Sequence, residues 1–290
     1  MHVLVAGCGW LGTALARSLV ARGDRVTGVR SDPGRAAALA ASGIEPLALD
    51  LANPSVPGTE EWLPDGVEAV VACQSARGDD PAAYRRAYVD AMATLIAAAR
   101  RRGVRCLVYT GSTGVFGQRD GSDVDERTPP APASPSAEVL VEAERRVLAA
   151  AKAGMPARVV RLSGLYGPGR AWMIDRVRNG QLALGPGDGA WMNSCHVDDA
   201  VSAVMAVLER GRDGAVYHAT DDDPMRLREV VALVAGRIGI SPRLAERAPP
   251  PGPNRRIHAE RSRAELGLHL RWPSLRQGLE PLLAGPAAAR

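Results

Sequence analysis

A glycine-rich hexapeptide near the start of the chain is the first segment whose spacing points to chemistry. It has the pattern G-x-G-x-x-G, follows the apolar run His2–Ala6 and opens a segment with leucines at helical spacing. In such a turn the first glycine permits the bend, the second lets the backbone approach a pyrophosphate, and the third allows close helix packing. Free N–H groups at the helix start stabilise the anion. The sequence therefore predicts a dinucleotide-binding turn with contacts at Gly7, Gly9, Trp10, Leu11 and Gly12.

The end of the next predicted strand indicates which dinucleotide is bound. Sites selective for NAD place an acidic residue near this point, where it contacts the ribose hydroxyls. Here the strand Arg25–Val29 is followed by Arg30 and Ser31. A guanidinium can pair with the 2′-phosphate of NADP, whereas Asp32, followed by Pro33, is placed to cap a helix. We therefore predict NADP(H) as cofactor and NAD(H) as second choice; the alternative for Arg30 is a solvated charge at the strand end.

The elements that must position these residues alternate along the first two-thirds of the chain. Short apolar runs alternate with helical patterns, which is typical of a parallel sheet covered by helices. The predicted strands are His2–Ala6, Arg25–Val29, Pro46–Ala48, Ala69–Ala72, Cys106–Thr110 and Ala157–Leu162. The predicted helices are Trp10–Ala21, Pro33–Ala41, Pro81–Arg102 and Ser136–Lys152. The expected fold class is α/β, a doubly wound parallel sheet of the Rossmann type.

The pattern changes after residue 165. Shorter helices are predicted at Val197–Arg210, Arg226–Ile238 and Arg261–Leu266, separated by the strand-like run Ala215–His218 and a proline-rich loop at 248–253. We therefore expect residues 1–165 to form the dinucleotide-binding domain. Residues 166–290 are expected to form a smaller α+β lobe on the substrate side, packed on the first domain and not independent of it.

Composition restricts the partner and the compartment. The chain of 290 residues is 46% hydrophobic and 23% charged, which is ordinary for a globular protein. Lys152 is the only lysine, so arginine supplies nearly all of the positive charge. The net charge of +4 is small and dispersed, so no nucleic-acid partner is expected. The cysteines show no paired spacing, and no secretory signal or membrane-spanning run is visible, which predicts a cytoplasmic protein without membrane contact or a metal site.

Several segments together resemble the extended short-chain dehydrogenase/reductase superfamily, the NAD-dependent epimerase/dehydratase group, along nearly the whole chain. Asp50-Leu51 is similar to the family's adenine contact. Residues 103–117, GVRCLVYTGSTGVFG, resemble the strand that carries its catalytic serine, which maps to Ser112. Residues 161–170, RLSGLYGPGR, are similar to its signature after the sixth strand, and residues 196–199 to its turn into the lobe. The resemblance implies cofactor contacts at Asp50 and Leu51, to which we add Ala72.

The family's catalytic pair is missing from the sequence. Catalysis in the family uses Tyr-x-x-x-Lys on a helix, where the tyrosinate is the acid and base and the lysine lowers its pKa. The aligned positions here hold Ser136 and Leu140, and the residue four before Lys152 is Leu148. Phe116 also replaces a usual tyrosine. The chain is therefore identified as an atypical member with a non-standard active site.

Two hydroxyl groups are the catalytic candidates. Ser112 lies beyond the carboxyl end of a predicted strand, where open α/β sheets bind ligands, and can donate to a substrate carbonyl. Its alternatives are a turn serine or a contact to the cofactor alone. Tyr166 is a weaker candidate for a substitute acid, because no lysine is available to lower its pKa. Packing, or a wall of the substrate site, is the alternative for Tyr166.

Polar clusters elsewhere have structural interpretations. His196 with Asp198 and Asp199 suggests a metal or a relay, but His196 is expected to end a buried strand and the aspartates to cap a helix near Ala200. The aspartates at 221–223 are expected to form a solvated turn. Three arginines lie in segments that the family uses around the substrate cleft, and they are either candidates to hold a phosphate or carboxylate or solvated surface residues: Arg170, Arg255 and Arg256.

These observations predict an NADP(H)-dependent oxidoreductase or epimerase with a non-standard proton donor. Its substrate is expected to be a small molecule, with a phosphate- or nucleotide-bearing compound among the candidates, and a homodimer is compatible with the sequence. The alternative is a non-catalytic NADP(H)-binding sensor that regulates a partner, which the missing Tyr and Lys favour. Ser112 and the segment of Tyr166 favour the enzyme. An FAD-binding protein would share the glycine turn but not the downstream pattern. The sequence leaves open whether the protein is an enzyme.

Overall fold

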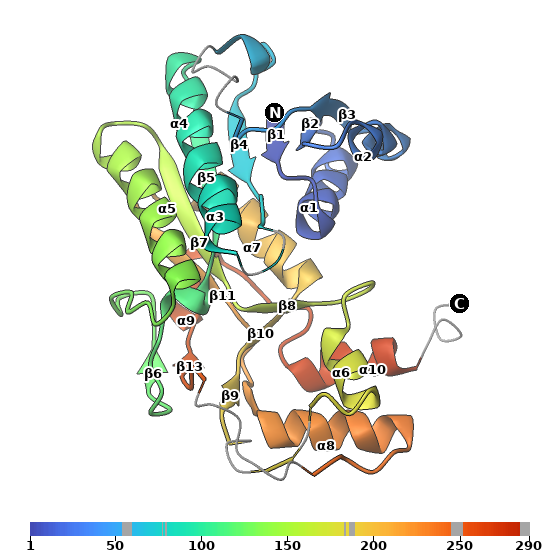
Figure 1. The fold of residues 1–290 in the computed structure, drawn as a ribbon. Helices are drawn as coiled ribbons and strands as arrows, with labels where there is room; N and C mark the ends of the chain where they lie inside the picture. Colours follow the sequence, from blue (N-terminus) through green and yellow to red (C-terminus); the bar gives the residue numbers. More distant parts are fainter. Residues whose placement is uncertain are drawn as a thin grey trace. The chain divides into compact units, whose positions relative to one another are not determined.

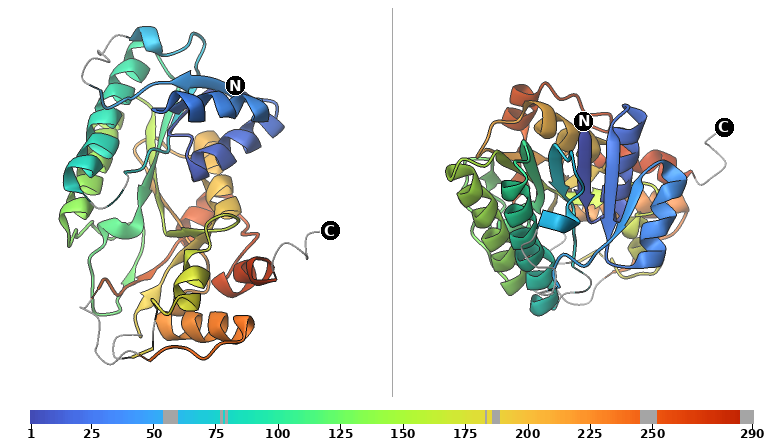
Figure 2. Two further views of the ribbon diagram at one scale, coloured as in Figure 1. Left: turned by 45° about the vertical axis from the view of Figure 1, so that its right-hand side comes forward. Right: turned by 90° about the horizontal axis from the view of Figure 1, so that it is seen from above.

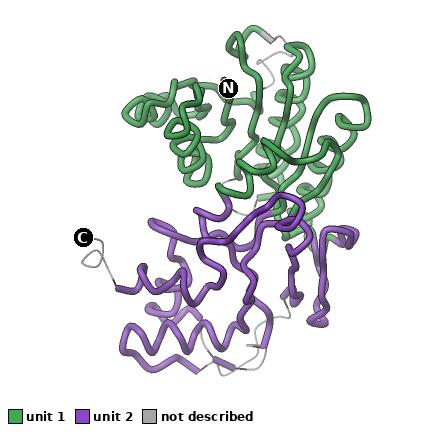
Figure 3. Tube along the Cα trace, turned by 180° about the vertical axis from the view of Figure 1, so that it is seen from behind, with its two compact units in different colours: residues 1–115, 132–161, 201–217 green, residues 116–131, 162–200, 218–290 purple. Residues whose placement is uncertain are grey.

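The computed structural model describes residues 1–53, 60–76, 78, 80–182, 184–185, 189–244 and 252–284. The chain divides into two compact units (Figure 3). Unit 1 comprises Met1–Val115, Pro132–Arg161 and Val201–Tyr217, and unit 2 comprises Phe116–Ala131, Leu162–Ala200 and His218–Arg290. The sequence suggests one boundary, after residue 165, whereas the chain passes between the units at several points, of which the nearest follows residue 161.

A seven-stranded parallel sheet lies at the centre of unit 1 (Figure 1). Its strands are β1 (His2–Ala6), β2 (Arg25–Arg30), β3 (Glu45–Ala48), β4 (Ala69–Ala72), β5 (Cys106–Ser112), β7 (Ala157–Leu162) and β11 (Val216–Ala219). Their order is β11-β7-β5-β4-β1-β2-β3. The strand order therefore reverses beside β1, whose Val3 pairs with Val26 of β2 and with Ala69 of β4. This confirms the doubly wound sheet and places a ligand crevice at the carboxyl ends of these strands.

All five residues of strand β1 are buried. Because successive side chains of a strand point to opposite sides of the sheet, both faces of β1 are covered. Leu4 and Ala6 belong to a core cluster that includes residues of α4 (Ala91–Arg101) and α5 (Pro135–Lys152). Helix α1 (Trp10–Ala21) buries its leucines on the opposite face. Figures 1 and 2 show α4 and α5 side by side as one layer, with α1 on the other side of the sheet. Both faces are thus covered, as the apolar strands predict.

Two predicted helices of unit 1 are interrupted. Helix α2 (Pro33–Ala37) gives way to a 3₁₀ turn, η1 (Ala38–Ser42). The helix expected at 81–102 consists of α3 (Pro81–Tyr84), a π-helical segment η3 (Arg85–Asp90) and α4. A π-helical turn is wider than an α-helical turn, and the spacing of apolar residues does not distinguish the two. Short 3₁₀ turns occur at η2 (Glu60–Trp62) and η4 (Thr113–Val115).

Unit 2 combines short strand pairs with helices, which agrees with the expected α+β character. The pairs are β8 (Gly164–Tyr166) with β10 (Ser194–His196), β9 (Trp191–Met192) with β12 (Met225–Arg226), and β6 (Asp123–Val124) with β13 (Arg256–Ile257). The helices are α6 (Trp172–Arg178), α8 (Leu227–Ile238), α9 (Glu260–Leu266) and α10 (Leu275–Leu283), and α7 (Val197–Arg210) begins in this unit. Strands of two or three residues are too short to show an alternating pattern, so most were not predicted. Within the described residues, no helix is long and apolar enough to cross a membrane.

Candidate functional site

Two positions of the turn after β1 need glycine because of the backbone conformation and packing of the protein. Gly7 has a φ of 84°, and a Cβ on it would lie 2.5 Å from the backbone of Gln74. A Cβ on Gly12 would overlap the carbonyl oxygen of Gly7. The left-handed backbone and the close packing of α1 on the turn therefore exclude any larger residue at either position.

Gly9 has no such requirement within the protein. Its φ of −73° is open to every residue, and a Cβ on it would meet no atom closer than 3.9 Å. Gly9 caps the N-terminus of α1 and lines a cavity. The space that a side chain would fill at Gly9 therefore lies where the N–H groups of a helix start can receive an anion. This geometry fits a pyrophosphate.

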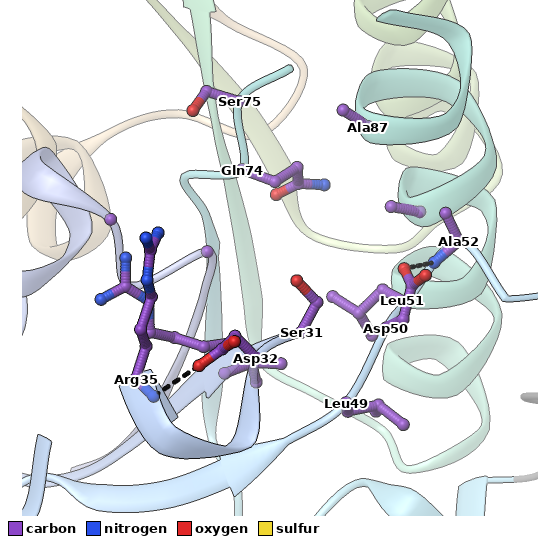
Figure 4. Close-up of a pocket in the computed structure, with 15 residues that line it drawn as sticks. Ser31, Asp32, Arg35, Leu49, Asp50, Leu51, Ala52, Gln74, Ser75 and Ala87 are labelled. Atoms are coloured by element: carbon purple, nitrogen blue, oxygen red, sulfur yellow. Dashed lines mark hydrogen bonds between the residues drawn. The ribbon is translucent and has the colours of Figure 1, made fainter. Parts of the chain in front are cut away.

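The cavity has a volume of about 270 Å³ and lies at the carboxyl ends of β1 to β4 (Figure 4). Six of the predicted cofactor contacts line it, namely Gly7, Gly9, Arg30, Ser31, Asp50 and Leu51. Four others are not among its lining residues: Trp10, Leu11, Gly12 and Ala72. Ala72 is fully buried inside β4, and the chain reaches the cavity two residues later, at Gln74 and Ser75.

Two arginine residues line the cavity together with Ser31. Arg30 is the last residue of β2, and Arg35 lies in the first turn of α2 (Figure 4). The Asp32 carboxylate caps α2 by accepting a 2.7 Å hydrogen bond from the Arg35 backbone N–H, as predicted. Within the described part of the chain, neither guanidinium forms an ion pair or a hydrogen bond. Sequence reasoning missed Arg35, although its place in the turn that Asp32 caps was a usable signal.

The loop after β3 is joined to the π-helical segment at the cavity. Asp50 accepts a 3.1 Å hydrogen bond from the Ala52 backbone N–H through Oδ1, and its Oδ2 pairs with Arg86 of η3 at 3.2 Å. Ala87 and Ala91, from the same helical segment, also line the cavity. The small side chains leave room for a ligand, and the exposed ion pair links the loop that carries the predicted adenine contact to η3.

Ser112 ends β5, half-buried, and its hydroxyl oxygen accepts a 3.0 Å hydrogen bond from the Gly114 N–H. That bond uses a lone pair of the oxygen and leaves the O–H able to donate. A Cβ on Gly114 would lie 3.1 Å from the Ser112 Oγ and 3.9 Å from a methyl group of Leu140, so both side chains lie near Gly114. The position that aligns with the family's lysine is therefore apolar and lies near the turn that follows Ser112. Ser136, at the aligned tyrosine position, contacts the Ser134 hydroxyl at 3.1 Å.

A buried ion pair holds α5 against the sheet. Arg161 of β7 donates to Glu144 through Nε and Nη2 at 2.8 to 3.2 Å, and the two side chains are only 4% and 2% exposed. Burial raises the pKa of Glu144, and the Arg161 guanidinium opposes that shift. Glu144 lies one helical turn after Leu140 on the same face. The ion pair therefore fixes the face of α5 that carries Leu140.

Tyr166 ends β8 of unit 2 and is fully buried. Its hydroxyl lies so close to Gly278 of α10 that a Cβ on this glycine would overlap it. The Tyr166 and His196 rings meet edge to face, with their centroids 5.2 Å apart. Burial raises the pKa of the phenol, and the nearby Asp221 adds to the shift. A phenol packed in this way is removed from solvent and is harder to ionise, which argues for packing over the predicted acid role.

The aspartates at the start of α7 have a different role from the one expected. His196 does end a buried strand, but α7 begins at Val197, before Asp198 and Asp199. The Asp199 carboxylate accepts hydrogen bonds from the backbone N–H groups of residues 271 and 272 at 2.7 and 3.0 Å, and Asp198 accepts one from the Trp272 indole at 3.0 Å. These two aspartates therefore fasten a distant segment of unit 2, and the prediction that they cap a helix near Ala200 was wrong.

Asp221 also departs from prediction, because it is 4% exposed and does not lie in a solvated turn. Neither carboxylate oxygen has a well-formed hydrogen bond within the described residues. Burial, and secondarily the charge of Asp223, raises the pKa of Asp221 to about 8, and the backbone N–H groups of Leu275 and Ser194 oppose this shift. Asp222, its neighbour, pairs with Arg263.

The arginines of the expected substrate side lie in different surroundings. Arg170 is exposed, and its backbone pairs with Gly167. Burial lowers the pKa of Arg255. The Arg256 guanidinium lies 5.4 Å from the ring centre of Trp191, over which Arg226 also lies, at 3.6 Å. Among the described residues, no group of three or more His, Cys, Asp or Glu side chains is placed to hold a metal ion.

Comparison with known proteins identifies relatives over most of the chain. "Protein YeeZ" of Escherichia coli K12 is 29% identical over 273 residues, which cover 93% of this chain and 96% of that protein. The "3-diazoavenalumate denitrifying reductase" of a Streptomyces species is 31% identical over 265 residues, 83% of each chain. A solved structure described as "MoeE5 in complex with UDP-glucose and NAD" superposes with a TM-score of 0.83 at 26% identity, covering 98% of both chains.

The family assignment follows from a match over most of the chain. Residues 3–220 match the model of the NAD dependent epimerase/dehydratase family. That stretch includes the glycine turn, the cavity and Ser112, and the resemblance drawn from the sequence is confirmed. The chain belongs to the NAD dependent epimerase/dehydratase family.

Proposed function

We propose that this protein is an NADP(H)-dependent oxidoreductase whose unit 1 binds the dinucleotide in the cavity beside the glycine turn. The observation that carries the proposal is the pair of guanidinium groups, Arg30 and Arg35, that line the cavity around Ser31 without an ion-pair partner among the described residues. Two unpaired cations beside a hydroxyl form a site for a doubly charged phosphate. NADP carries such a group on its adenosine ribose and NAD does not.

The glycine turn and Ser112 supply the remaining parts of the proposed site. Gly9 leaves the start of α1 open to a pyrophosphate, and Asp50 and Leu51 border the expected adenine position. When bound, the nicotinamide supplies or accepts a hydride. Ser112, whose O–H is able to donate, would stabilise negative charge on a carbonyl oxygen. Because Leu140 lies where a lysine would lower a tyrosine pKa, the proton would come from water or from the substrate.

The name of one relative supports reduction, and the ligand of one solved structure supports a nucleotide-bearing small molecule. The Streptomyces relative is named a reductase, and the structure described as MoeE5 contains UDP-glucose. In unit 2, Arg226 and Arg256 lie over Trp191, which supports an anionic substrate. We therefore propose a small carbonyl compound, with phosphate- or nucleotide-bearing compounds as the first candidates to test.

The cofactor assignment is tested by calorimetric titration with NADP⁺ and NAD⁺. Loss of a charge-assisted hydrogen bond costs roughly 1.5 to 3 kcal/mol, so Arg30→Asp should weaken NADP⁺ binding at least about tenfold and leave NAD⁺ binding little changed. Arg35→Ala should act in the same direction. Arg85→Ala is the matched control, because Arg85 is an exposed arginine that pairs with Glu142 and does not line the cavity. Equal affinity of the unaltered protein for NAD⁺ and NADP⁺ would contradict the proposal.

A non-catalytic NADP(H) sensor is the second candidate, and the apolar Leu140 at the aligned lysine position is the observation that favours it. The two candidates are separated by following the near-ultraviolet absorbance of NADPH with a panel of carbonyl compounds and nucleotide sugars. Oxidation of NADPH that depends on one of these compounds supports the oxidoreductase. Tight NADP(H) binding without turnover of any compound would support the sensor.

A further inference from the structure

The end of β4 places a side-chain amide at the cavity, and the described residues provide no partner for it. Gln74 lines the cavity and is partly exposed, but its side-chain Oε1 and Nε2 are both buried. Within the described residues, neither atom has a hydrogen-bond partner. A buried amide without partners destabilises the folded protein, and such groups are rare in native structures. Within the described part of the chain, the amide therefore has a capacity for hydrogen bonds that a ligand could use.

The backbone of Gln74 is held in place and leaves only its side chain free to adjust. Its N and Cα would lie 2.5 Å from a Cβ on Gly7, so the glycine turn packs directly on this residue. The preceding residue, Cys73, donates a 2.7 Å backbone hydrogen bond to Ala6. Figure 4 shows the Gln74 side chain extending from the end of β4 among the residues that line the cavity.

The chemistry of the amide restricts what can pair with it. A primary amide has an acceptor oxygen and two N–H donors, so its partner must both donate and accept. A phosphate only accepts, and Arg30, Arg35 and the start of α1 already provide for anions at this cavity. A ribose hydroxyl both donates and accepts. We propose that the Gln74 side chain turns toward the cavity when the dinucleotide binds, so that its amide hydrogen-bonds a ribose hydroxyl. The proposal rests on the proposed function, because it requires a dinucleotide in the cavity.

The experiment compares the stability of the ligand-free protein with its affinity for the ligand. Gln74→Met keeps the length of the side chain and removes both polar atoms. The unfolding temperature of the ligand-free variant should match or exceed that of the unaltered protein, because two unsatisfied atoms are gone. Its dissociation constant for NADP⁺ should rise about 5-fold for one lost hydrogen bond or about 30-fold for two. A structural residue would not separate these effects in this way.

The control is another glutamine with a buried, unpartnered side-chain oxygen, Gln118, which does not line the cavity. Gln118→Met should leave NADP⁺ affinity unchanged. Gln74→Glu serves as a second variant if Gln74→Met folds poorly, and it should also weaken binding, since a carboxylate cannot donate. Titration with adenosine 2′,5′-bisphosphate identifies the ribose. A loss with both ligands assigns the adenosine ribose, and a loss with NADP⁺ alone assigns the nicotinamide ribose.

The outcomes for this inference and for the proposed function are distinct. If the unaltered protein binds neither dinucleotide, the proposed function fails, and the role of Gln74 falls with it. If the unaltered protein binds NADP⁺ and both Gln74 variants bind equally well, the inference on Gln74 is overturned while the function stands. A Gln74→Met variant that loses stability and affinity together, with Gln74→Glu binding normally, would mark the residue as structural and would also overturn the inference.

Discussion

The glycine turn of unit 1 and the aspartate run of unit 2 both follow a strand of the central sheet, but they differ in what determines their structure. Gly7 and Gly12 are specified by contacts within a few residues and with the neighbouring strand end. Asp221 is buried beneath segments distant in sequence, and its own neighbours, Asp222 and Asp223, suggest a solvated turn. A glycine motif thus specifies the local backbone conformation. Whether a charged side chain is buried depends instead on packing against distant segments, which the local sequence does not indicate.

A substitution at Gly9 should have the largest effect on dinucleotide binding. A valine at this position meets no protein atom at its Cβ, so Gly9→Val should keep an unfolding temperature close to that of the unaltered protein. Its side chain would occupy the approach to the helix start, so calorimetry should detect no NADP(H) binding. Gly12→Ala is the contrast, because its Cβ overlaps the Gly7 carbonyl and should lower the unfolding temperature. Unchanged affinity in Gly9→Val would refute the assignment of this turn.

The two catalytic candidates, Ser112 and Tyr166, also differ in their burial. Ser112 is half-buried at the end of β5, while Tyr166 is fully buried in unit 2. Once a substrate is identified, Ser112→Ala should lower turnover about 10- to 1,000-fold, the order expected for loss of one donor to a developing oxyanion. NADP(H) affinity should change little. Tyr166→Phe is the matched control and should leave turnover near that of the unaltered protein. Steady-state rates that reverse this order would show that the buried phenol takes part in the chemistry.

The buried carboxyl of Asp221 should have a smaller effect, seen in the pH dependence of stability. Its pKa lies at about 8 in the folded protein and at 3.8 as the unperturbed value. Between these values the folded state holds a proton that the unfolded state has lost, so stability falls as pH rises. This group contributes at most about 1.4 kcal/mol per pH unit to that fall. Below pH 3.8 and above pH 8, its contribution to the slope vanishes.

Urea unfolding at a series of pH values between 4 and 8 measures this slope. Asp221→Asn should flatten it, because an amide does not titrate. Asp222→Asn is the control, since Asp222 is partly exposed and paired with Arg263. Identical slopes in Asp221→Asn and the unaltered protein would mean that Asp221 ionises in the folded state as it does in the unfolded one.

The sequence predicted the parts of the fold that depend on local patterns. Strand β1, helix α1 and helix α7 have the predicted bounds, because each combines an apolar pattern with a clear start or end signal. The cavity was predicted through Gly9, Arg30 and Asp50, which lie in or directly after strands whose order follows from the motif.

Residues whose role depends on distant partners were missed. Asp199 binds backbone N–H groups 72 and 73 residues along the chain, and no local pattern indicates that pairing. Gln74 was passed over in favour of Ala72, because the length of β4 decides which residue reaches the cavity. The π-helical η3 was also missed, since it shares the apolar spacing of an α-helix.

Helix α5 ends at Lys152, the single lysine of the chain, and this side chain is exposed. In a parallel sheet with connecting helices, a helix that leads into a strand ends at the edge of the sheet where that strand begins. Lys152 precedes β7, so it lies at the edge opposite the cavity. An amine-reactive reagent would therefore find one side-chain amine per chain, at a known position away from the dinucleotide site, besides the N-terminal amine. The scarcity of lysine thus limits side-chain attachment for immobilised binding measurements to one position, without any engineered residue.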